Sequence, residues 1–121
     1  MTDKKMTEYE NLGFAPVSEG SPVEATLLWG NRQTGPAAVM IRVPEGHEEP
    51  WHHHSSTYHA VIVKGQFQSR SQDASDSTTV YGPGSYVVQP GGVVHREVNA
   101  GKGDLVALVY FDGPIDFVPL G

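Results

Sequence analysis

Residues 46–65 read GHEEPWHHHSSTYHAVIVKG, and they decide the fold because they join closely spaced histidines to a run of strand-forming residues. Side chains of a strand alternate between its two faces, so residues two apart point the same way. If residues 50–54 are extended, His52 and His54 therefore share one face while His53 points to the other. This pattern predicts a pair of imidazoles aimed together at the interior of a sheet structure.

His59 lies on the following predicted strand, and the same alternation predicts where it points. It shares its face with Val61, whereas Lys64 falls on the opposite face. A lysine indicates a face that meets solvent or a partner subunit, so we expect His59 to point inward. His95 follows the turn Pro90-Gly91-Gly92 and could complete the group in a barrel. The blander interpretation of His59 is that it only supports the other histidines.

Fourteen glycines and nine prolines divide the chain into short runs rich in Val, Ile, Tyr and Thr. This punctuation is typical of an all-β sandwich or barrel, and no window has a convincing helical period. Gly65 is expected to form a hairpin turn with positive φ. Strands are predicted near 23–29, 37–43, 50–54, 58–64, 66–71, 77–81, 85–89, 93–98 and 105–111.

Length and composition limit the class of protein. The 121 residues suit one domain, which we divide into an N-terminal arm, residues 1–20, and a β-barrel, residues 21–121. The absence of cysteine excludes disulfides and thiolate metal sites and is compatible with a cytoplasmic protein. No secretory signal or apolar run long enough for a membrane span is apparent. A net charge of −6 argues against a nucleic-acid-binding surface.

Several buried imidazoles need a partner, because unpaired they are costly to bury and once protonated they repel each other. A divalent metal resolves this by taking the neutral lone pairs. Imidazole suits Zn, Cu, Fe and Ni. We therefore expect one divalent transition metal held by four histidines, which are His52, His54, His59 and His95.

The quoted stretch resembles the first motif of the cupins, in which a glycine precedes H-x-H by five residues and a glutamate and a glycine follow. Residues 84–99, GSYVVQPGGVVHREVN, resemble the second cupin motif. The resemblance implies a single-domain cupin, a jelly-roll barrel or double-stranded β-helix. It also implies ligand roles for His52, His54 and His95. Weaker likenesses in TLLWG and YFDGPIDF point to acetylacetone dioxygenase-like cupins and to the cupin half of zinc anti-sigma factors.

One departure from the motif concerns the fourth ligand. His59 stands near the position where cupins usually have a glutamate, and the gap to Gly65 is one residue short. The resemblance carries the fourth ligand position to His59 with a changed residue type. Exchanging a carboxylate for an imidazole would leave one more positive charge on the site and so raise the Lewis acidity of the metal.

Three further residues are candidates for catalysis or substrate binding, each beside an ordinary alternative. Glu97 shares a face with His95 and could orient a histidine or act as a base, or be a rim charge. Arg42 could bind a substrate carboxylate or pair with Glu24. Tyr58 is a candidate at the barrel mouth. Other large residues expected near the interior or mouth are Trp29, Met40, Trp51 and Tyr110.

These observations favour a metal-dependent enzyme, an oxygenase acting on a small oxygenated molecule such as a β-diketone, or an isomerase or lyase acting on a small acid. The alternative is a non-enzymatic metal- or ligand-binding or sensing module. A structural cupin that has lost its metal is disfavoured by the intact histidines. The expected partners are a small molecule and, by resemblance to cupins, a second copy in a homodimer, with no nucleic acid and no membrane.

Overall fold

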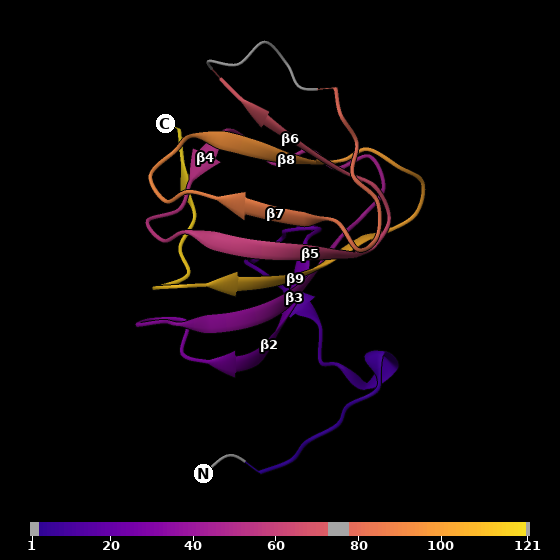
Figure 1. Ribbon diagram of the computed structural model, residues 1–121, viewed down its shortest axis with the longest axis vertical. Helices are drawn as coiled ribbons and strands as arrows, with labels where there is room; N and C mark the ends of the chain where they lie inside the picture. Colours follow the sequence, from indigo (N-terminus) through magenta and orange to yellow (C-terminus); the bar gives the residue numbers. More distant parts are fainter. Residues whose placement is uncertain (1–2, 73–77, 121) are drawn as a thin grey trace.

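The computed structural model describes residues 3–72 and 78–120, and these residues form two facing β-sheets with one short 3-10 helix (Figure 1). The all-β prediction is confirmed. In the described part of the chain, no helix has the length and apolar character needed to cross a membrane. The elements are η1 (Tyr9–Asn11), β1 (Ala15–Pro16), β2 (Glu24–Gly30), β3 (Ala37–Val43), β4 (His52–His53), β5 (Tyr58–Lys64), β6 (Phe67–Ser71), β7 (Tyr86–Gln89), β8 (His95–Asn99), β9 (Leu105–Phe111) and β10 (Val118–Pro119).

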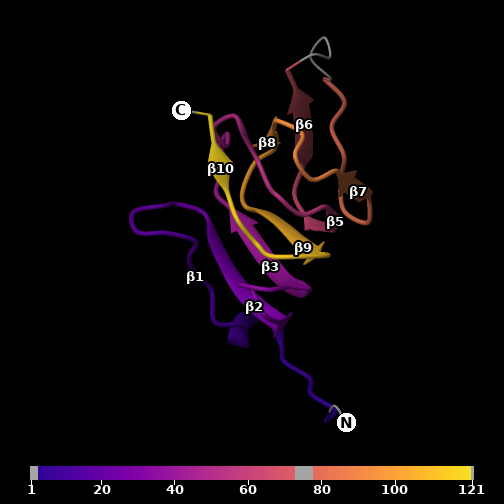
Figure 2. The ribbon, with the colours of Figure 1, turned by 90° about the vertical axis from the view of Figure 1, so that its left-hand side faces the viewer.

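Strands that are far apart in the sequence lie side by side in both sheets. The larger sheet has the order β1-β2-β3-β9-β5-β7 and the smaller one β10-β4-β8-β6. The chain crosses repeatedly between the two sheets. For example, β3 belongs to the larger sheet, the next strand β4 to the smaller one, and β5 to the larger one again. In Figure 2 the chain ends at β10, in yellow, on the side of the molecule that carries β6 and β8.

Most predicted strands are present, with boundaries that differ by a residue or two at their ends. The exception is the strand expected over 77–81. Residue 77 lies outside the described residues, residues 78–80 have no strand structure, and Tyr81 makes only an isolated bridge to Phe67. Gly65 forms the expected turn with φ of 90°, where a Cβ would come within 2.7 Å of the Asp104 carbonyl oxygen.

The side chains of β5 point to the opposite faces from those predicted, and a β-bulge in this strand is the reason. The partners of β5 on β9 shift between Ile62, which faces Ala107, and Lys64, which faces Val106. Because the bulge inserts an extra residue, Lys64 does not continue the face of Ile62. Ile62 is buried, while Val61 and Val63 are 40% and 46% exposed. The charge of Lys64 therefore gave the wrong phase for the strand.

The N-terminal residues lie against the outside of the larger sheet. Ala15 and Pro16 of β1 pair with β2, and the Tyr9 and Phe14 rings contact each other with centroids 5.7 Å apart. Residues 3–8 run below β2 in Figure 1, and Lys5 and Thr7 line an outer depression together with Leu27 and Met40 of the larger sheet. The division into an arm, residues 1–20, and a barrel, residues 21–121, stays a prediction.

Candidate metal centre

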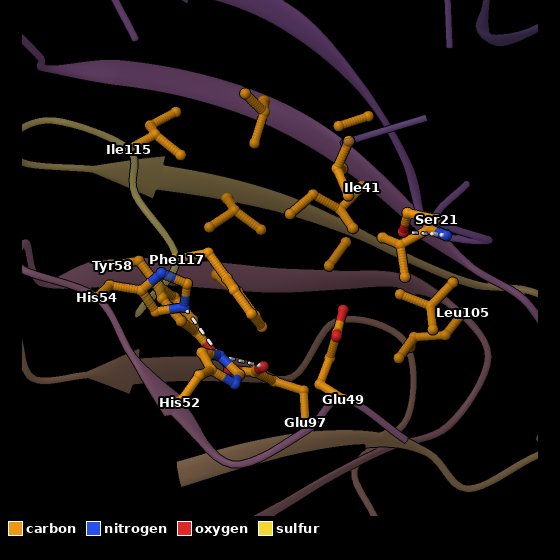
Figure 3. A pocket seen from close by; sticks show the side chains of 18 of the residues that line it. Ser21, Ile41, Glu49, His52, His54, Tyr58, Glu97, Leu105, Ile115 and Phe117 are labelled. Carbon is orange, nitrogen blue, oxygen red and sulfur yellow. Dashed lines mark hydrogen bonds and ion pairs between the residues drawn. The ribbon is translucent and has the colours of Figure 1, made fainter. Parts of the chain in front are cut away.

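Three imidazoles and one carboxylate converge between the two sheets. His52 of β4 and His95 of β8 are opposite residues in the smaller sheet, and both are fully buried. His54 follows β4, and Glu97 lies two residues beyond His95 on the same face of β8. One ligand atom from each of these four residues lies within 4.8 Å of all the others. Figure 3 shows His52, His54 and Glu97 directed toward one another.

The backbone sets the tautomer of each ring. The Nδ1–H groups of His52, His54 and His95 donate to the carbonyl oxygens of Pro50 at 2.6 Å, Asp116 at 2.5 Å and Val93 at 2.9 Å. A carbonyl oxygen can only accept, so Nδ1 must carry the proton in all three rings. The Nε2 atoms are then left to bind another group, as in histidines that are oriented for metal binding.

The Nε2 atoms of His52 and His54 lie 3.2 Å apart. If both rings are neutral, two lone pairs face each other at this distance with no proton between them, which is repulsive. Two nitrogens bound to one metal at about 2.1 Å would be separated by about 3.0–3.4 Å. The spacing and the donor set therefore fit a shared divalent transition metal, and imidazole with one carboxylate suits such an ion.

Glu97 supplies the carboxylate of the cluster. Its Oε1 lies 3.1 Å from Nε2 of His52, and its Oε2 contacts Nε2 of His95. The Tyr58 hydroxyl, from β5 of the opposite sheet, donates to the same Oε2 at 2.9 Å. Tyr58 lies one position before His59, near the place where cupins usually have a glutamate. Here the carboxylate of the cluster comes from β8, and Tyr58 contacts it.

The electrostatics of the cluster keep Glu97 ionised. Without a metal, the Nε2 atoms of His52 and His95 can instead carry a second proton. Burial acts to raise the pKa of Glu97, but the hydrogen bonds that these two protonated rings would donate, together with their charges, outweigh burial and hold that pKa far below its usual value. Burial is the largest single influence on His52 and acts to lower its pKa, but the hydrogen bond and charge of Glu97, with the hydrogen bond to Pro50, together outweigh it, so the pKa of His52 is raised. For His54 burial dominates and lowers the pKa. Burial also raises the pKa of Tyr58 well above its usual value, which keeps the phenol protonated and able to donate.

The structure does not bring His59 to this cluster, and its prediction as the fourth ligand is wrong. Its Nδ1 contacts the Tyr86 hydroxyl, and its ring stacks on that of Tyr86 with centroids 5.9 Å apart. It also lies opposite Tyr110 of β9, on the outer face of the larger sheet. The cause is the phase of β5, which turns Tyr58 and Ala60 inward and His59 outward.

Arg42 likewise lies outside the interior. Its Nε and Nη2 donate to Oε1 of Glu24 at 3.1 and 2.9 Å, and its guanidinium covers the Phe14 ring at 4.0 Å. Glu24 and Arg42 are opposite residues on β2 and β3. The alternative of a pairing with Glu24 is therefore the one realised, and Arg42 does not line the cavity described below.

Four other large residues were expected near the interior or mouth of the barrel. None of them lines the cavity described below. Trp29 and Tyr110 contact each other on the outer face, with centroids 5.9 Å apart. Met40 lines a shallow outer depression together with Leu27. Trp51 stacks under the Arg96 guanidinium at 4.7 Å. These aromatic and apolar side chains pack on surfaces rather than on the metal centre.

The segment 112–120 covers one side of the site, a placement that the sequence pattern does not predict. Phe117 stacks on the His52 ring with centroids 4.2 Å apart at 24°, and β10 pairs with β4. The Asp116 carboxylate accepts hydrogen bonds from the Ser55 backbone at 2.8 Å and its hydroxyl at 2.6 Å. These bonds fix the Asp116 carbonyl that orients His54. The sequence of this segment gives no local sign of these contacts, because they depend on residues about sixty positions earlier.

A cavity of about 680 Å³ extends from the metal centre between the sheets. His52, His54 and Glu97 line one part of it, and aliphatic or aromatic side chains form most of the remaining wall. The size suits a small organic molecule. The apolar lining includes Val39, Ile41, Ile62, Leu105, Val109, Phe111 and Ile115.

Comparison with known proteins identifies the family. The model of the ChrR cupin-like domain matches residues 2–115, nearly the whole chain. The chain belongs to the ChrR cupin-like domain family. Membership in the cupins confirms the jelly-roll prediction made from the two histidine motifs. A search of curated proteins finds no match for this cupin.

Solved structures show the same fold at low sequence identity. An RmlC-like cupin from Ralstonia eutropha JMP134 has a TM-score of 0.73 at 19% identity, covering 92% of this chain and 69% of that one. The polyketide cyclase RemF from Streptomyces resistomycificus has a TM-score of 0.75 at 14% identity, covering 98% and 87%. A chain of the Rhodobacter sphaeroides complex of SigE with the anti-sigma ChrR has a TM-score of 0.66 at 19% identity, covering 87% and 51%.

Proposed function

We propose that this cupin is a metal-dependent enzyme whose divalent transition metal is held by His52, His54, His95 and Glu97. The observation that carries the proposal is the 3.2 Å separation of the His52 and His54 Nε2 atoms, since both rings already use their Nδ1–H for backbone carbonyls. A cation between these nitrogens removes the repulsion of their lone pairs. Imidazole and carboxylate together favour Fe, Zn, Ni or Cu over Mg or Ca.

The presence of Glu97 in place of His59 changes the expected chemistry. Three neutral imidazoles and one carboxylate leave a divalent ion with one positive charge less than four imidazoles would. The high Lewis acidity expected from four histidines therefore does not apply. A moderately acidic centre that binds a carbonyl or enolate oxygen fits this set of ligands better.

The chain's own residues position the ligand set. The Tyr58 hydroxyl holds Oε2 of Glu97, and the three backbone carbonyls hold the imidazole planes. Phe117 covers the His52 ring from the side of the chain end. When bound, the metal supplies Lewis acidity toward a substrate oxygen and, if it is iron, redox chemistry with O₂.

The apolar cavity favours an oxygenated substrate with a hydrophobic body. A β-diketone presents two oxygens to a metal and otherwise apolar surface to the wall, so it fits better than a small, highly charged acid. We therefore favour a dioxygenase-like reaction on such a molecule over an isomerase or lyase acting on a small acid. The substrate itself stays a proposal.

Metal analysis of protein purified without a histidine tag tests the proposal. We expect about one equivalent of transition metal per chain, and oxygen uptake when iron-loaded protein receives acetylacetone or a longer β-diketone. The matched control is a protein with His54→Gln, which keeps a polar side chain but should lose the metal. Wild-type protein that binds no transition metal would overturn the proposal.

The alternative function is a non-enzymatic metal- or ligand-binding or sensing module. Membership in the ChrR cupin-like family favours it, because one structural neighbour comes from a complex of a sigma factor with an anti-sigma protein. Tightly held zinc that resists exchange, with no turnover of diketones, would support this alternative. Exchangeable iron with oxygen uptake would support the enzyme.

The homodimer and the cytoplasmic location also stay predictions. An exposed apolar surface is consistent with a covering partner, and the outer face of the larger sheet presents Val61, Val88, Leu108 and Tyr86. Val61 and Leu108 are opposite residues on β5 and β9, near the middle of that face. We propose a second copy of this chain as the partner.

A further inference from the structure

The segment 112–120, which we call the strap, is attached along its length to residues 51–57, the part of the chain that carries His52 and His54. The hydrogen bonds between the two segments join Asp112 to Thr57, Pro114 to Ser56, Asp116 to Ser55 and Leu120 to Trp51. The strap therefore runs antiparallel to the stretch that supplies two of the four cluster residues. In Figure 3 its Phe117 lies beside the rings of His52 and His54.

The three imidazoles of the metal centre differ in what holds their Nδ1–H groups. For His52 and His95 the acceptor is a carbonyl oxygen only two residues earlier in the chain. For His54 the acceptor is the Asp116 carbonyl oxygen, 62 residues later, in the strap. A bond between near neighbours persists while the local backbone keeps its shape, but a bond between distant segments is lost when the two separate. The hydrogen bond that orients His54 therefore requires the strap to be docked.

The side chain of Asp116 keeps its own carbonyl group in place. Its Oδ1 accepts a hydrogen bond from the Ser55 amide at 2.8 Å, and its Oδ2 accepts one from the Ser55 hydroxyl at 2.6 Å. Ser55 directly follows His54, so these two neighbours hold Asp116 by its side chain and by its main chain. Asp116 is therefore the residue at which the strap is joined to a metal ligand.

The other end of the strap is only lightly held. Phe117, Val118 and Leu120 are 45%, 39% and 48% exposed, and β10 is a strand of two exposed residues at the edge of its sheet. Segments with few buried apolar contacts and exposed backbone hydrogen bonds open at a lower free energy than core strands. A modest change in the bonds at His54 is therefore able to shift the balance between the docked and the open strap.

A metal bound to Nε2 of His54 would make such a change. Coordination fixes the plane of the imidazole, and with it the direction in which Nδ1–H points toward the strap. Without a metal the ring has one bond fewer and turns more easily. Two equilibria that share a residue in this way are linked reciprocally, so a metal that favours docking is itself bound more tightly by the docked form, by the same factor.

We propose that Asp116 is a positioning residue for the metal centre, and that through His54 it couples docking of the strap to binding of the metal. This proposal rests on the proposed function, because it requires the metal centre, and it adds a form of regulation to that centre. Loss of the metal would loosen the strap from residues 51–57, and displacement of the strap would weaken the hold on the metal. The strap would thus signal at the protein surface whether the metal is bound.

Amide hydrogen exchange of the full chain, with and without saturating zinc, measures the coupling. We expect zinc to slow exchange of residues 112–120 by roughly tenfold. The internal reference is β1, which is also an exposed two-residue strand at a sheet edge, and its exchange should change little. The effect on the strap should vanish in Asp116→Ala.

The matched control variant is Asp112→Ala, in the same strap. It removes a carboxylate that accepts a hydrogen bond from the Thr57 amide at 3.2 Å, and it leaves the bond between Asp116 and His54 in place. Zinc should therefore still slow exchange of the strap in this variant. A general loosening of the strap is in this way separated from loss of the coupling.

Competition against a chelator of known affinity measures the reciprocal effect. Asp116→Ala should weaken zinc binding by about tenfold, and Asp112→Ala should leave it unchanged. Asp116→Asn should restore most of the affinity, because its amide oxygen accepts from the Ser55 amide and its NH₂ group donates to the Ser55 hydroxyl oxygen. The visible absorption of cobalt-loaded protein reports the geometry of the ligands, and it should change in Asp116→Ala but not in Asp112→Ala.

Two outcomes would overturn the coupling while leaving the metal centre intact. One is wild-type protein that binds zinc with no change in the exchange of the strap relative to β1, and this comparison needs no variant. The other is an equal loss of zinc affinity in Asp116→Ala and Asp112→Ala. Wild-type protein that binds no transition metal would instead reject the proposed function, and the coupling with it. Melting temperatures of the metal-free variants show whether each one folds.

Discussion

The Tyr58 hydroxyl donates a 2.9 Å hydrogen bond to Oε2 of Glu97, and this bond links the two sheets at the candidate metal centre. Tyr58 belongs to β5 of the larger sheet and Glu97 to β8 of the smaller one. The bond fixes the orientation of the carboxylate that completes a group of three imidazoles. The cupin motif usually has a glutamate near the position of Tyr58. In this chain Tyr58 instead orients Glu97, a glutamate from another strand.

Removal of that hydroxyl should weaken metal binding without unfolding the protein. In Tyr58→Phe the aromatic ring still packs on Phe111, but Glu97 loses a donor that orients it. Partners of this kind typically change metal affinity by about 10–100-fold. Competition against a chelator of known affinity measures the effect. Tyr110→Phe, on the outer face, is the control, and an equal loss in both variants would contradict the role of Tyr58.

The ligand set can be tested by comparing two histidines that differ in orientation. His95→Gln should lower the metal content of purified protein to near zero, because it removes a buried ligand from the cluster. His59→Gln should leave the metal content unchanged, since His59 contacts Tyr86 on the outer face. Elemental analysis of both proteins measures the result. Metal loss in His59→Gln would restore His59 as a ligand.

The metal-free protein should lose stability as the pH rises above 6.5. Burial lowers the pKa of His52, but the hydrogen bond and charge of Glu97 and the hydrogen bond to Pro50 together raise it in the folded state. The stabilising contribution of His52 is therefore complete below pH 6.5 and disappears as the pH passes the folded pKa. The pKa of His54 is lowered in the folded state, so this residue reduces the free energy of unfolding only below pH 6.5, where the unfolded chain binds the proton more readily. Urea midpoints at pH 6.5 and 8.5 measure the difference.

Two controls accompany the pH experiment. Glu97→Gln removes the carboxylate that raises the pKa of His52, so its urea midpoint should depend much less on pH in this range. Saturating zinc should reverse the trend, because a metal competes with protons for the imidazoles and stabilises the folded state it binds. A midpoint of metal-free protein that rises from pH 6.5 to 8.5 would contradict the coupling of His52 to Glu97.

The segment that ends the described chain should slow metal release. Phe117 stacks on His52, and its removal in Phe117→Ala would open that side of the ring to solvent. We expect the rate of metal transfer to excess chelator to rise several-fold, with little change in the melting temperature because Phe117 is partly exposed. Leu120→Ala removes a neighbouring exposed side chain as the control. Equal rates in both variants would show that Phe117 does not cover the site.

The predicted homodimer can be tested on the outer face of the larger sheet. Leu108→Lys places a charge near the middle of the exposed apolar surface, opposite Val61. We expect light scattering to give the dimer mass for wild-type protein and the monomer mass for this variant. Val17→Lys introduces a charge elsewhere and should remain dimeric. A wild-type protein that is monomeric at micromolar concentration would refute the prediction.

Local sequence patterns were sufficient for the strands and for three of the four cluster residues. Alternation and turn residues predict strands directly, and the H-x-H pattern places His52 and His54 on one face wherever the segment is extended. His95 follows from its place just after a turn in the second motif. These inferences depend on neighbours in the chain, so the sequence contains the information they need.

Only the tertiary structure decided the fourth member of the cluster and the cover of the site. The bulge between Ile62 and Lys64 reverses the face that Lys64 indicates, so His59 points out and Tyr58 points in. Glu97 and Phe117 reach the imidazoles through pairings between strands that are distant in the sequence. Periodicity specifies how side chains alternate along one strand, but the register between strands determines which of them meet.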